Sequence, residues 1–91
     1  MAKGDMHRST QRVIEILQCV SKDPAQGLTL TDLAGMLQAP KSSLFPIVHT
    51  LCHMGMLSLD KDTSRYSIGF KAYEIGNVYV RRGGISADIE A

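Results

Sequence analysis

Hydroxyl, imidazole and aromatic side chains gather on one short segment in the middle of the chain. Between residues 40 and 54, four aliphatic side chains recur at i, i+3, i+4 and i+7, which is the spacing of one buried helical face. The other side of this helix then carries Ser42, Ser43, Phe45, Pro46, His49, Thr50 and His53. Hydroxyls and imidazoles can bind phosphates or base edges, and an aromatic ring can contact a thymine methyl. A plain solvated face is the alternative, which the aromatic Phe45 disfavours.

The distribution of charge permits a polyanionic partner but also has a simpler explanation. The net charge is only +1. No carboxylate occurs between Asp32 and Asp60, whereas Lys41, His49 and His53 lie within that gap. A surface facing a polyanion would need such a stretch. A buried helix with few charges explains it equally well, and on charge alone that simpler explanation is preferred.

The histidines and a cysteine of the same segment could also bind a metal. His49, Cys52 and His53 lie at i, i+3 and i+4, so they share one side of a helix. A structural zinc site needs four ligands, and no fourth is near in the sequence, so we expect no metal and no other cofactor. Cys19 is expected to be a small buried hydrophobe. Since no nucleophile elbow, P-loop or dinucleotide fingerprint occurs, we expect no enzyme.

Length and composition predict one small globular domain. The chain has 91 residues, of which 44% are hydrophobic and 21% are charged. Two cysteines exclude a disulfide-rich secreted scaffold, and residues 1–12 have no apolar run typical of a signal peptide. The charge-free stretch 42–59 contains proline, glycine and two histidines, so it does not resemble a membrane span. We therefore expect a cytoplasmic protein.

Short helices and a hairpin must position the polar segment. Apolar periodicity predicts helices at about 9–22, 31–37, 40–54 and 70–82. Alternating side chains around a polar turn predict a hairpin over about 56–68, and residues 28–30 can form only a small strand. This order predicts a mainly α fold with a small β-hairpin, the winged helix-turn-helix, over residues 9–69.

Capping residues predict where these helices begin and end. Ser9 and Thr31 are expected to cap the first and second helices, and Pro40 to occupy the first position of the third. Gly55 is expected to follow the end of that third helix. Pro46 would then lie inside the helix, where its missing N–H and its ring cost about 3 kcal/mol.

The hairpin and the last helix each offer a further contact surface. Lys61 and Arg65 lie at the tip and flank of the hairpin, where long cations can reach a DNA backbone, although neighbouring aspartates oppose this. The last helix is apolar round most of its circumference, so one face needs a partner from elsewhere. A second copy, bound through the first and last helices with Ile75, Val78 and Tyr79 in the contact, is the economical partner. A C-terminal domain is the alternative.

Several ordered pieces of the chain match one family pattern. They are Ser9-Thr10-Gln11-Arg12 with Glu15-Ile16-Leu17, Gly27-Leu28-Thr29-Leu30-Thr31-Asp32-Leu33-Ala34, Pro40-Lys41-Ser42-Ser43-Leu44-Phe45, Thr50-Leu51 with Gly55-Met56-Leu57, and Arg65-Tyr66-Ser67-Ile68-Gly69. No single piece is specific. In register, they resemble the N-terminal DNA-binding domain of the isocitrate lyase regulator (IclR) family of bacterial transcription factors.

The resemblance implies a function and a division of the chain. It implies a helix-turn-helix at about 30–54, a wing at about 56–68, and a linker helix with the start of a truncated C-terminal region at 70–91. Such regulators bind operator DNA as homodimers and carry a C-terminal domain for a small-molecule effector. We therefore predict sequence-specific DNA binding by a one-component transcriptional regulator.

The expected DNA contacts come from three places in the chain. The major groove would be contacted by Lys41, Ser42, Ser43, Phe45, Pro46, His49 and Thr50. Thr29 and Thr31 would anchor the preceding helix to phosphate, and Lys61 and Arg65 would be wing contacts.

Two departures from the family pattern affect this prediction. Gln38 stands where the family usually has glycine, so we expect a left-handed backbone there. Pro46 stands where an arginine is common, so that contact cannot be transferred. The missing arginine and the small net charge favour the main alternative, a winged-helix module that binds protein and not DNA. A metal-sensing domain that uses the two histidines and Cys52 is a third, weaker hypothesis.

Overall fold

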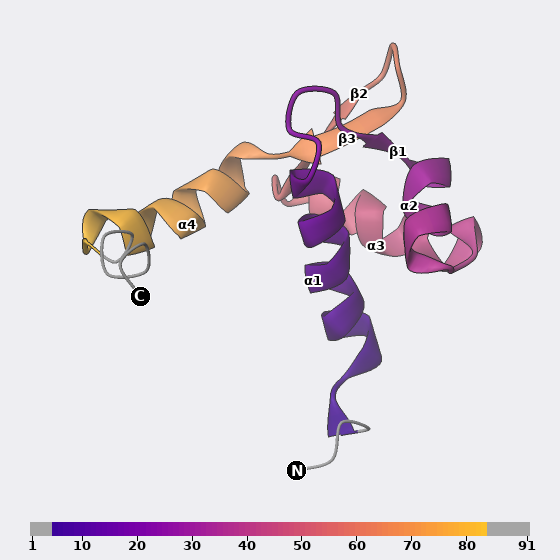
Figure 1. Cartoon of the computed structure of the whole chain (residues 1–91), viewed down its shortest axis with the longest axis horizontal. Helices are drawn as coiled ribbons and strands as arrows, with labels where there is room; N and C mark the ends of the chain where they lie inside the picture. Colours follow the sequence, from indigo (N-terminus) through magenta and orange to yellow (C-terminus); the bar gives the residue numbers. More distant parts are fainter. Residues whose placement is uncertain (1–4, 84–91) are drawn as a thin grey trace.

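The predicted fold class is confirmed by the arrangement of the elements. A computed structural model describes residues 5–83. Figure 1 shows three helices gathered around one end of a small sheet, with a fourth helix leading away from it. In chain order the elements are α1 (Arg8–Ser21), β1 (Leu28–Thr29), α2 (Leu30–Leu37), α3 (Lys41–His53), β2 (Leu57–Asp60), β3 (Arg65–Ile68) and α4 (Phe70–Arg81).

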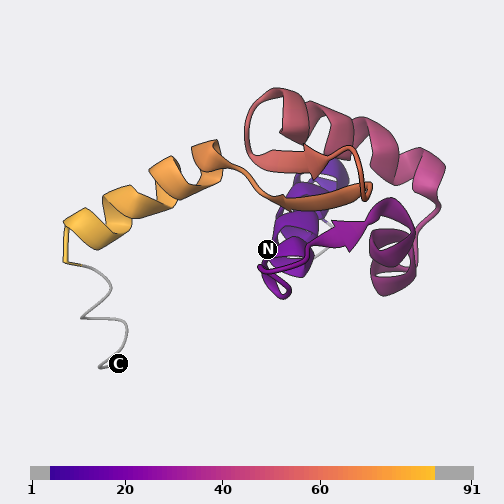
Figure 2. The same cartoon turned by 90° about the horizontal axis from the view of Figure 1, so that it is seen from above.

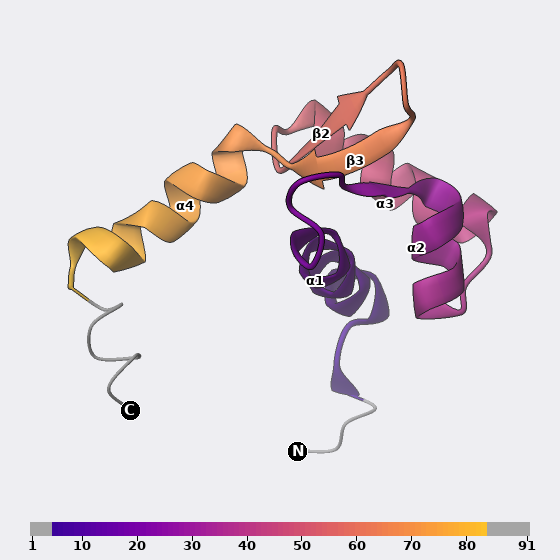
Figure 3. The same cartoon turned by 45° about the horizontal axis from the view of Figure 1, so that its top comes forward.

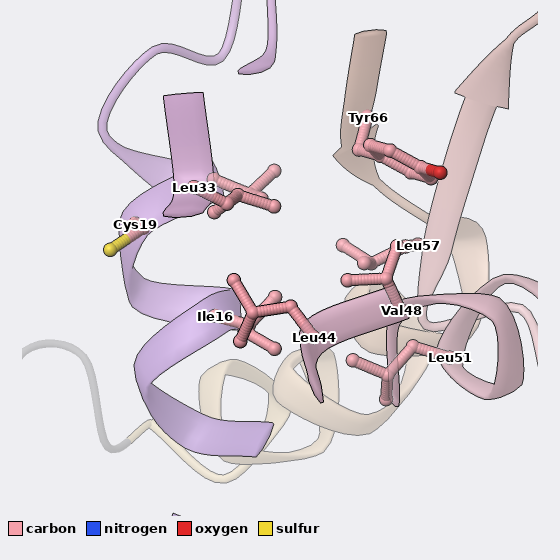
Figure 4. Packing of buried hydrophobic residues seen from close by; sticks show 9 residues of the cluster. Ile16, Cys19, Leu33, Leu44, Val48, Leu51, Leu57 and Tyr66 are labelled. Atoms are coloured by element: carbon pink, nitrogen blue, oxygen red, sulfur yellow. The ribbon is translucent and has the colours of Figure 1, made fainter. Parts of the chain in front are cut away.

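One hydrophobic core joins the first three helices to the sheet. Its side chains come from α1, α2, α3, β2 and β3, and the labelled aliphatic ones converge between these elements (Figure 4). The most deeply buried are Ile16, Val20, Leu33, Leu44, Val48 and Leu57. Cys19 is 7% exposed and belongs to this core, which confirms it as a small buried hydrophobe. Since α3 buries its aliphatic stripe here, its polar side must face away from the domain.

The sheet has three strands, because the small strand predicted near residues 28–30 pairs with the predicted hairpin. Its order is β1-β3-β2, and both pairings are antiparallel. Tyr66 of β3 lies opposite Leu28 on one side and Leu59 on the other. Gly27, with φ +75°, allows this close approach, because a Cβ there would overlap the carbonyl oxygen of Tyr66. The start of α2 is thereby tied to the hairpin.

Three predicted helix starts are wrong by one or two residues. His7, not Ser9, caps α1, because its Nδ1 accepts a hydrogen bond from the backbone N–H of Thr10. Thr29, not Thr31, caps α2, because its Oγ1 accepts a hydrogen bond from the backbone N–H of Asp32. Pro40 is the N-cap of α3 and not its first helical residue, since its ψ of 145° is extended.

The ends of α2 and α3 follow the prediction. Gln38 ends α2 with φ 51° and ψ 50°, the left-handed conformation expected where the family usually has glycine. Gly55 follows α3 with φ +84°, as expected for a residue just beyond a helix end.

The last helix leaves the domain. Figures 2 and 3 show α4 projecting away from the three-helix core, with only its first turn near the sheet. It contacts β2, and none of its residues is buried. Its predicted end at Arg82 lies one residue beyond the observed Arg81. The expected C-terminal region at 84–91 lies outside the described residues. Among residues 5–83, no helix is long and apolar enough to cross a membrane.

Candidate nucleic-acid interface

The polar side of α3 is exposed, as its periodicity predicted. We call this surface the outer face of α3, and it consists of Ser42, Ser43, Phe45, Pro46, His49, Thr50 and His53. Every one of these residues is exposed, whereas Leu44, Val48 and Leu51 on the opposite side are buried. Lys41, at the start of the helix, is exposed beside them. The face carries no carboxylate, so nothing on it repels phosphate.

Two rings form the aromatic part of the outer face. The Phe45 and His49 rings stack with centroids 5.6 Å apart and an interplanar angle of 29°. Phe45 is 48% exposed, so a large part of its ring is available to a partner. The stack places the two rings side by side on the exposed surface of the helix.

The hydroxyls of the outer face differ in what they can still bind. Ser43 Oγ donates to the carbonyl oxygen of Pro40 at 2.9 Å, and Thr50 Oγ1 donates to that of Pro46 at 2.8 Å. Both oxygens keep lone pairs that can accept from a base amino group. The Ser42 hydroxyl makes no hydrogen bond with any described residue, so it can either donate or accept.

Pro46 lies inside α3 without ending it. It is the sixth residue of the helix, which continues unbroken to His53. Having no N–H, Pro46 cannot satisfy the carbonyl of Ser42 four residues earlier. Pro46 and Thr50 also line a groove of about 440 Å³ whose other wall is α1, including Val13 and Ile14. Pro46 therefore lies on the border between the outer face and this apolar groove.

The start of α2 is held by a reciprocal pair. Thr29 Oγ1 accepts from the N–H of Asp32 at 3.0 Å, and Asp32 Oδ2 accepts from the N–H of Thr29 at 3.0 Å. The N–H of Thr29, and then its hydroxyl, lower the pKa of Asp32. Desolvation opposes them, and the charge of Arg65 adds a smaller lowering effect. Thr31, two residues after Thr29, is exposed. The proposed phosphate anchors thus lie beside an ionised carboxylate.

The two hairpin cations are placed differently. Lys61 is exposed in the turn between β2 and β3, and it has no ion pair with any residue of 5–83. Arg65 is half-buried, with Nη1 3.2 Å from the carbonyl oxygen of Gly27 and 4.0 Å from Asp32 Oδ2. Arg65 therefore ties β3 to the loop before β1, a role that no local sequence signal indicated.

The three candidate metal ligands do not form a cluster. Within residues 5–83, no group of three His, Cys, Asp or Glu side chains is placed to hold a metal ion. Cys52 is turned partly toward the core, and burial raises the pKa of its thiol, which disfavours the thiolate that binds metals. His49 is engaged instead with Phe45.

Sequence patterns missed one basic feature beside the outer face. Arg8 and Arg12 of α1 line a hollow of about 420 Å³ together with Ser43 of α3. We call it the arginine hollow. Periodicity could not reveal it, because its walls come from segments about thirty residues apart along the chain. The one local signal was the pair of arginines four positions apart at the start of α1.

The geometry and the comparisons with known proteins identify the same class of DNA-binding domain. Two helices joined by a tight turn, packed beside a hairpin and presenting an exposed polar face, define a winged helix-turn-helix domain. Residues 9–61 match the family model described as the IclR helix-turn-helix domain. The chain therefore belongs to the IclR family, whose members are DNA-binding transcription regulators.

Individual relatives support this assignment. The chain is 30% identical over 78 residues to the HTH-type transcriptional regulator BhcR of Paracoccus denitrificans, covering 86% of this chain. An IclR transcriptional regulator from Alicyclobacillus acidocaldarius matches 79% of the chain with TM-score 0.74 and 25% identity. The repressor BlcR of Agobacterium tumefaciens matches 82% with TM-score 0.71 and 25% identity.

The match covers a minor part of each relative. The chain spans 27% of the length of BhcR and 29% of each of the two solved chains. The similarity therefore concerns the winged helix-turn-helix and says nothing about the remaining length of those proteins.

Proposed function

We propose that this chain binds operator DNA sequence-specifically as part of a one-component transcriptional regulator, with α3 in the major groove. The observation that carries the proposal is the outer face of α3, which is exposed, free of carboxylates and carries the stacked rings of Phe45 and His49. Such a helix fits the major groove, where hydroxyls, imidazoles and an apolar ring can distinguish base pairs. Action on chromosomal DNA implies a cytoplasmic location, which we propose together with it.

The proposed contacts follow the arrangement of exposed side chains. Base and groove contacts are assigned to Lys41, Ser42, Ser43, Phe45, Pro46, His49 and Thr50. Thr29 and Thr31 would position α2 on a phosphate, although Thr29 already caps the helix. Lys61 would contact the backbone as part of the wing. Arg65 would do so only by giving up part of its bonding to Gly27 and Asp32.

We further propose that the chain dimerises through α4. Ile75, Val78 and Tyr79 are 59%, 46% and 45% exposed, which leaves a continuous apolar strip along the helix. Residues at these positions share one side of a helix. A second copy would cover this strip by a symmetric contact, and operators with two half-sites would match such a dimer. A small-molecule effector would bind a further domain outside this chain.

A salt titration tests DNA binding against the alternative of a protein-interaction module. Fluorescence anisotropy would follow binding to a random-sequence duplex as the salt is raised from about 50 to 200 mM. Because few cations are available, we expect weak affinity and a slope equivalent to about two to four phosphates per protomer. Affinity independent of salt, or no binding even at low salt, would overturn the proposal in favour of the interaction module.

A further inference from the structure

A hollow lined by two arginines lies next to the outer face of α3. The arginine hollow encloses about 420 Å³ where the first turns of α1 meet the turn before α3 and the first turn of α3. Its polar walls come from Arg8, Ser9, Arg12, Gln38 and Ser43. Ser43 belongs both to this hollow and to the outer face, so the two surfaces are continuous.

The hollow carries a surplus of positive charge. Arg12 Nη1 lies 2.9 Å from Glu15 Oε1, and Gln11 Nε2 donates to the other oxygen of the same carboxylate at 3.2 Å. Arg8, by contrast, is exposed and has no ion pair with any residue in the range 5–83. One guanidinium is therefore compensated, whereas the charge of Arg8 is left for a ligand.

We propose that the arginine hollow binds a backbone phosphodiester of the DNA that α3 contacts. This inference rests on the proposed function and extends it to α1, a helix to which no DNA contact has been assigned above. A guanidinium presents N–H donors in a planar fork that matches two phosphate oxygens, and the Ser9 hydroxyl adds a neutral donor.

The position of the hollow favours DNA over other anions. The N-terminal residues of a helix in the major groove contact base edges, and the sugar-phosphate strands border that groove. The hollow flanks this end of α3, so a strand at the groove rim would pass Ser43 and reach Arg8. A phosphate held there would set the register of α3 and would carry no sequence information itself.

The structure offers a matched pair of variants for the test. Arg8→Gln removes the uncompensated charge at the first residue of α1. Lys22→Gln removes one exposed positive charge at the other end of the same helix, far from the hollow. We expect Arg8→Gln to reduce the slope of log affinity against log salt by about 1 and to weaken all duplex sequences equally, while Lys22→Gln changes neither. Arg8→Lys should restore the slope but only part of the affinity. Circular dichroism would verify that each variant is folded.

Methylphosphonate scanning identifies the ligand directly. A duplex selected from a random pool by the wild-type chain is synthesised with one neutral methylphosphonate at each backbone position in turn. We expect one position per half-site at which neutralisation weakens the wild type but has no further effect on Arg8→Gln. If Arg8→Gln behaves like Lys22→Gln while the wild type binds DNA, the inference is overturned and the proposed function stands. If the wild type binds no duplex, the proposed function fails and the phosphodiester site fails with it.

Discussion

The rings of Phe45 and His49 stack one helical turn apart on the outer face of α3, with their centroids 5.6 Å apart. Neither ring is held by the core, since both side chains are exposed. The contact that the two rings share is therefore with each other. The pair forms an aromatic ridge between the hydroxyls of Ser42 and Thr50, and the Phe45 ring is its apolar part. Such a ridge is suited to the C5 methyl groups that distinguish thymine in the major groove.

Phe45→Ala should remove recognition of thymine methyls. Replacing a contacted dT by dU deletes one methyl and keeps every hydrogen bond, at an expected cost of about 0.8 kcal/mol, or about fourfold in affinity. We expect the wild type to show this loss at one or two positions of a selected duplex, and Phe45→Ala to show none. His53→Ala, at the far end of α3, serves as the control and should keep the dT preference. A wild type that binds the dU and dT duplexes equally at every position would contradict this role of Phe45.

The Thr29–Asp32 pair makes stability depend on pH in the acid range. The folded-state pKa of Asp32 is lowered from its ordinary 3.8, so the pair stabilises the native state above that value. The contribution is lost as the pH falls through the lowered folded-state pKa. Urea unfolding should therefore show wild type more stable than Asp32→Asn near neutral pH, with the difference shrinking as the pH falls below about 4. A difference that is constant with pH would mean that the ionised carboxylate contributes nothing.

Thr29→Ala tests the hydroxyl half of the same capping box. Loss of an N-cap hydroxyl costs about 1 kcal/mol of unfolding free energy. Thr29→Ser keeps the acceptor and should recover most of that loss. Thr31→Ala, two residues later, should leave stability nearly unchanged, because Thr31 does not cap the helix. Equal destabilisation by the two alanine variants would argue against Thr29 as the cap.

Ile75→Glu should convert a dimer of this chain into a monomer. In a symmetric dimer each substitution occurs in both copies, so Ile75→Glu places two charges in the apolar contact. We therefore expect dimer affinity to fall more than about a hundredfold. Asn77→Glu introduces the same side chain on the opposite side of α4 and should leave the dimer intact. Sedimentation velocity measures both variants. A monomeric wild type at high concentration would show that α4 packs against something other than a second copy.

Substitutions of Pro46 separate helix stability from DNA contact. Pro46→Ala returns the N–H that the Ser42 carbonyl lacks and removes the ring, which should raise the unfolding free energy by up to about 3 kcal/mol. Pro46→Arg restores the same bond and adds a cation on the outer face. We expect both variants to be more stable than wild type, and only Pro46→Arg to bind DNA more tightly. If Pro46→Ala and Pro46→Arg bind DNA with equal affinity, the side chain at position 46 faces the apolar groove between α1 and α3 and does not contact DNA.

The spacing of residues along the chain determined which faces of the helices are buried and which are exposed. The periodic aliphatic residues of α1 and α3 predicted both the buried stripe and the exposed outer face, because a helix places side chains by sequence distance alone. The left-handed Gln38 was expected instead from the resemblance to the family, which usually has glycine at this position. The helix starts were less accurate. Several neighbouring residues can serve as caps, and the Asp32 carboxylate, three residues after Thr29, selects that residue over Thr31.

Only the tertiary structure decided the features built from distant segments. The pairing of β1 with β3 brings Gly27 to Arg65 and turns that guanidinium inward, 38 residues away along the chain. The packing of α1 beside the start of α3 likewise joins Arg8 to Ser43 across the arginine hollow. The angles and distances between packed helices determine which distant residues come into contact. These angles and distances depend on the shape of the whole core. No periodicity within a single segment contains that information.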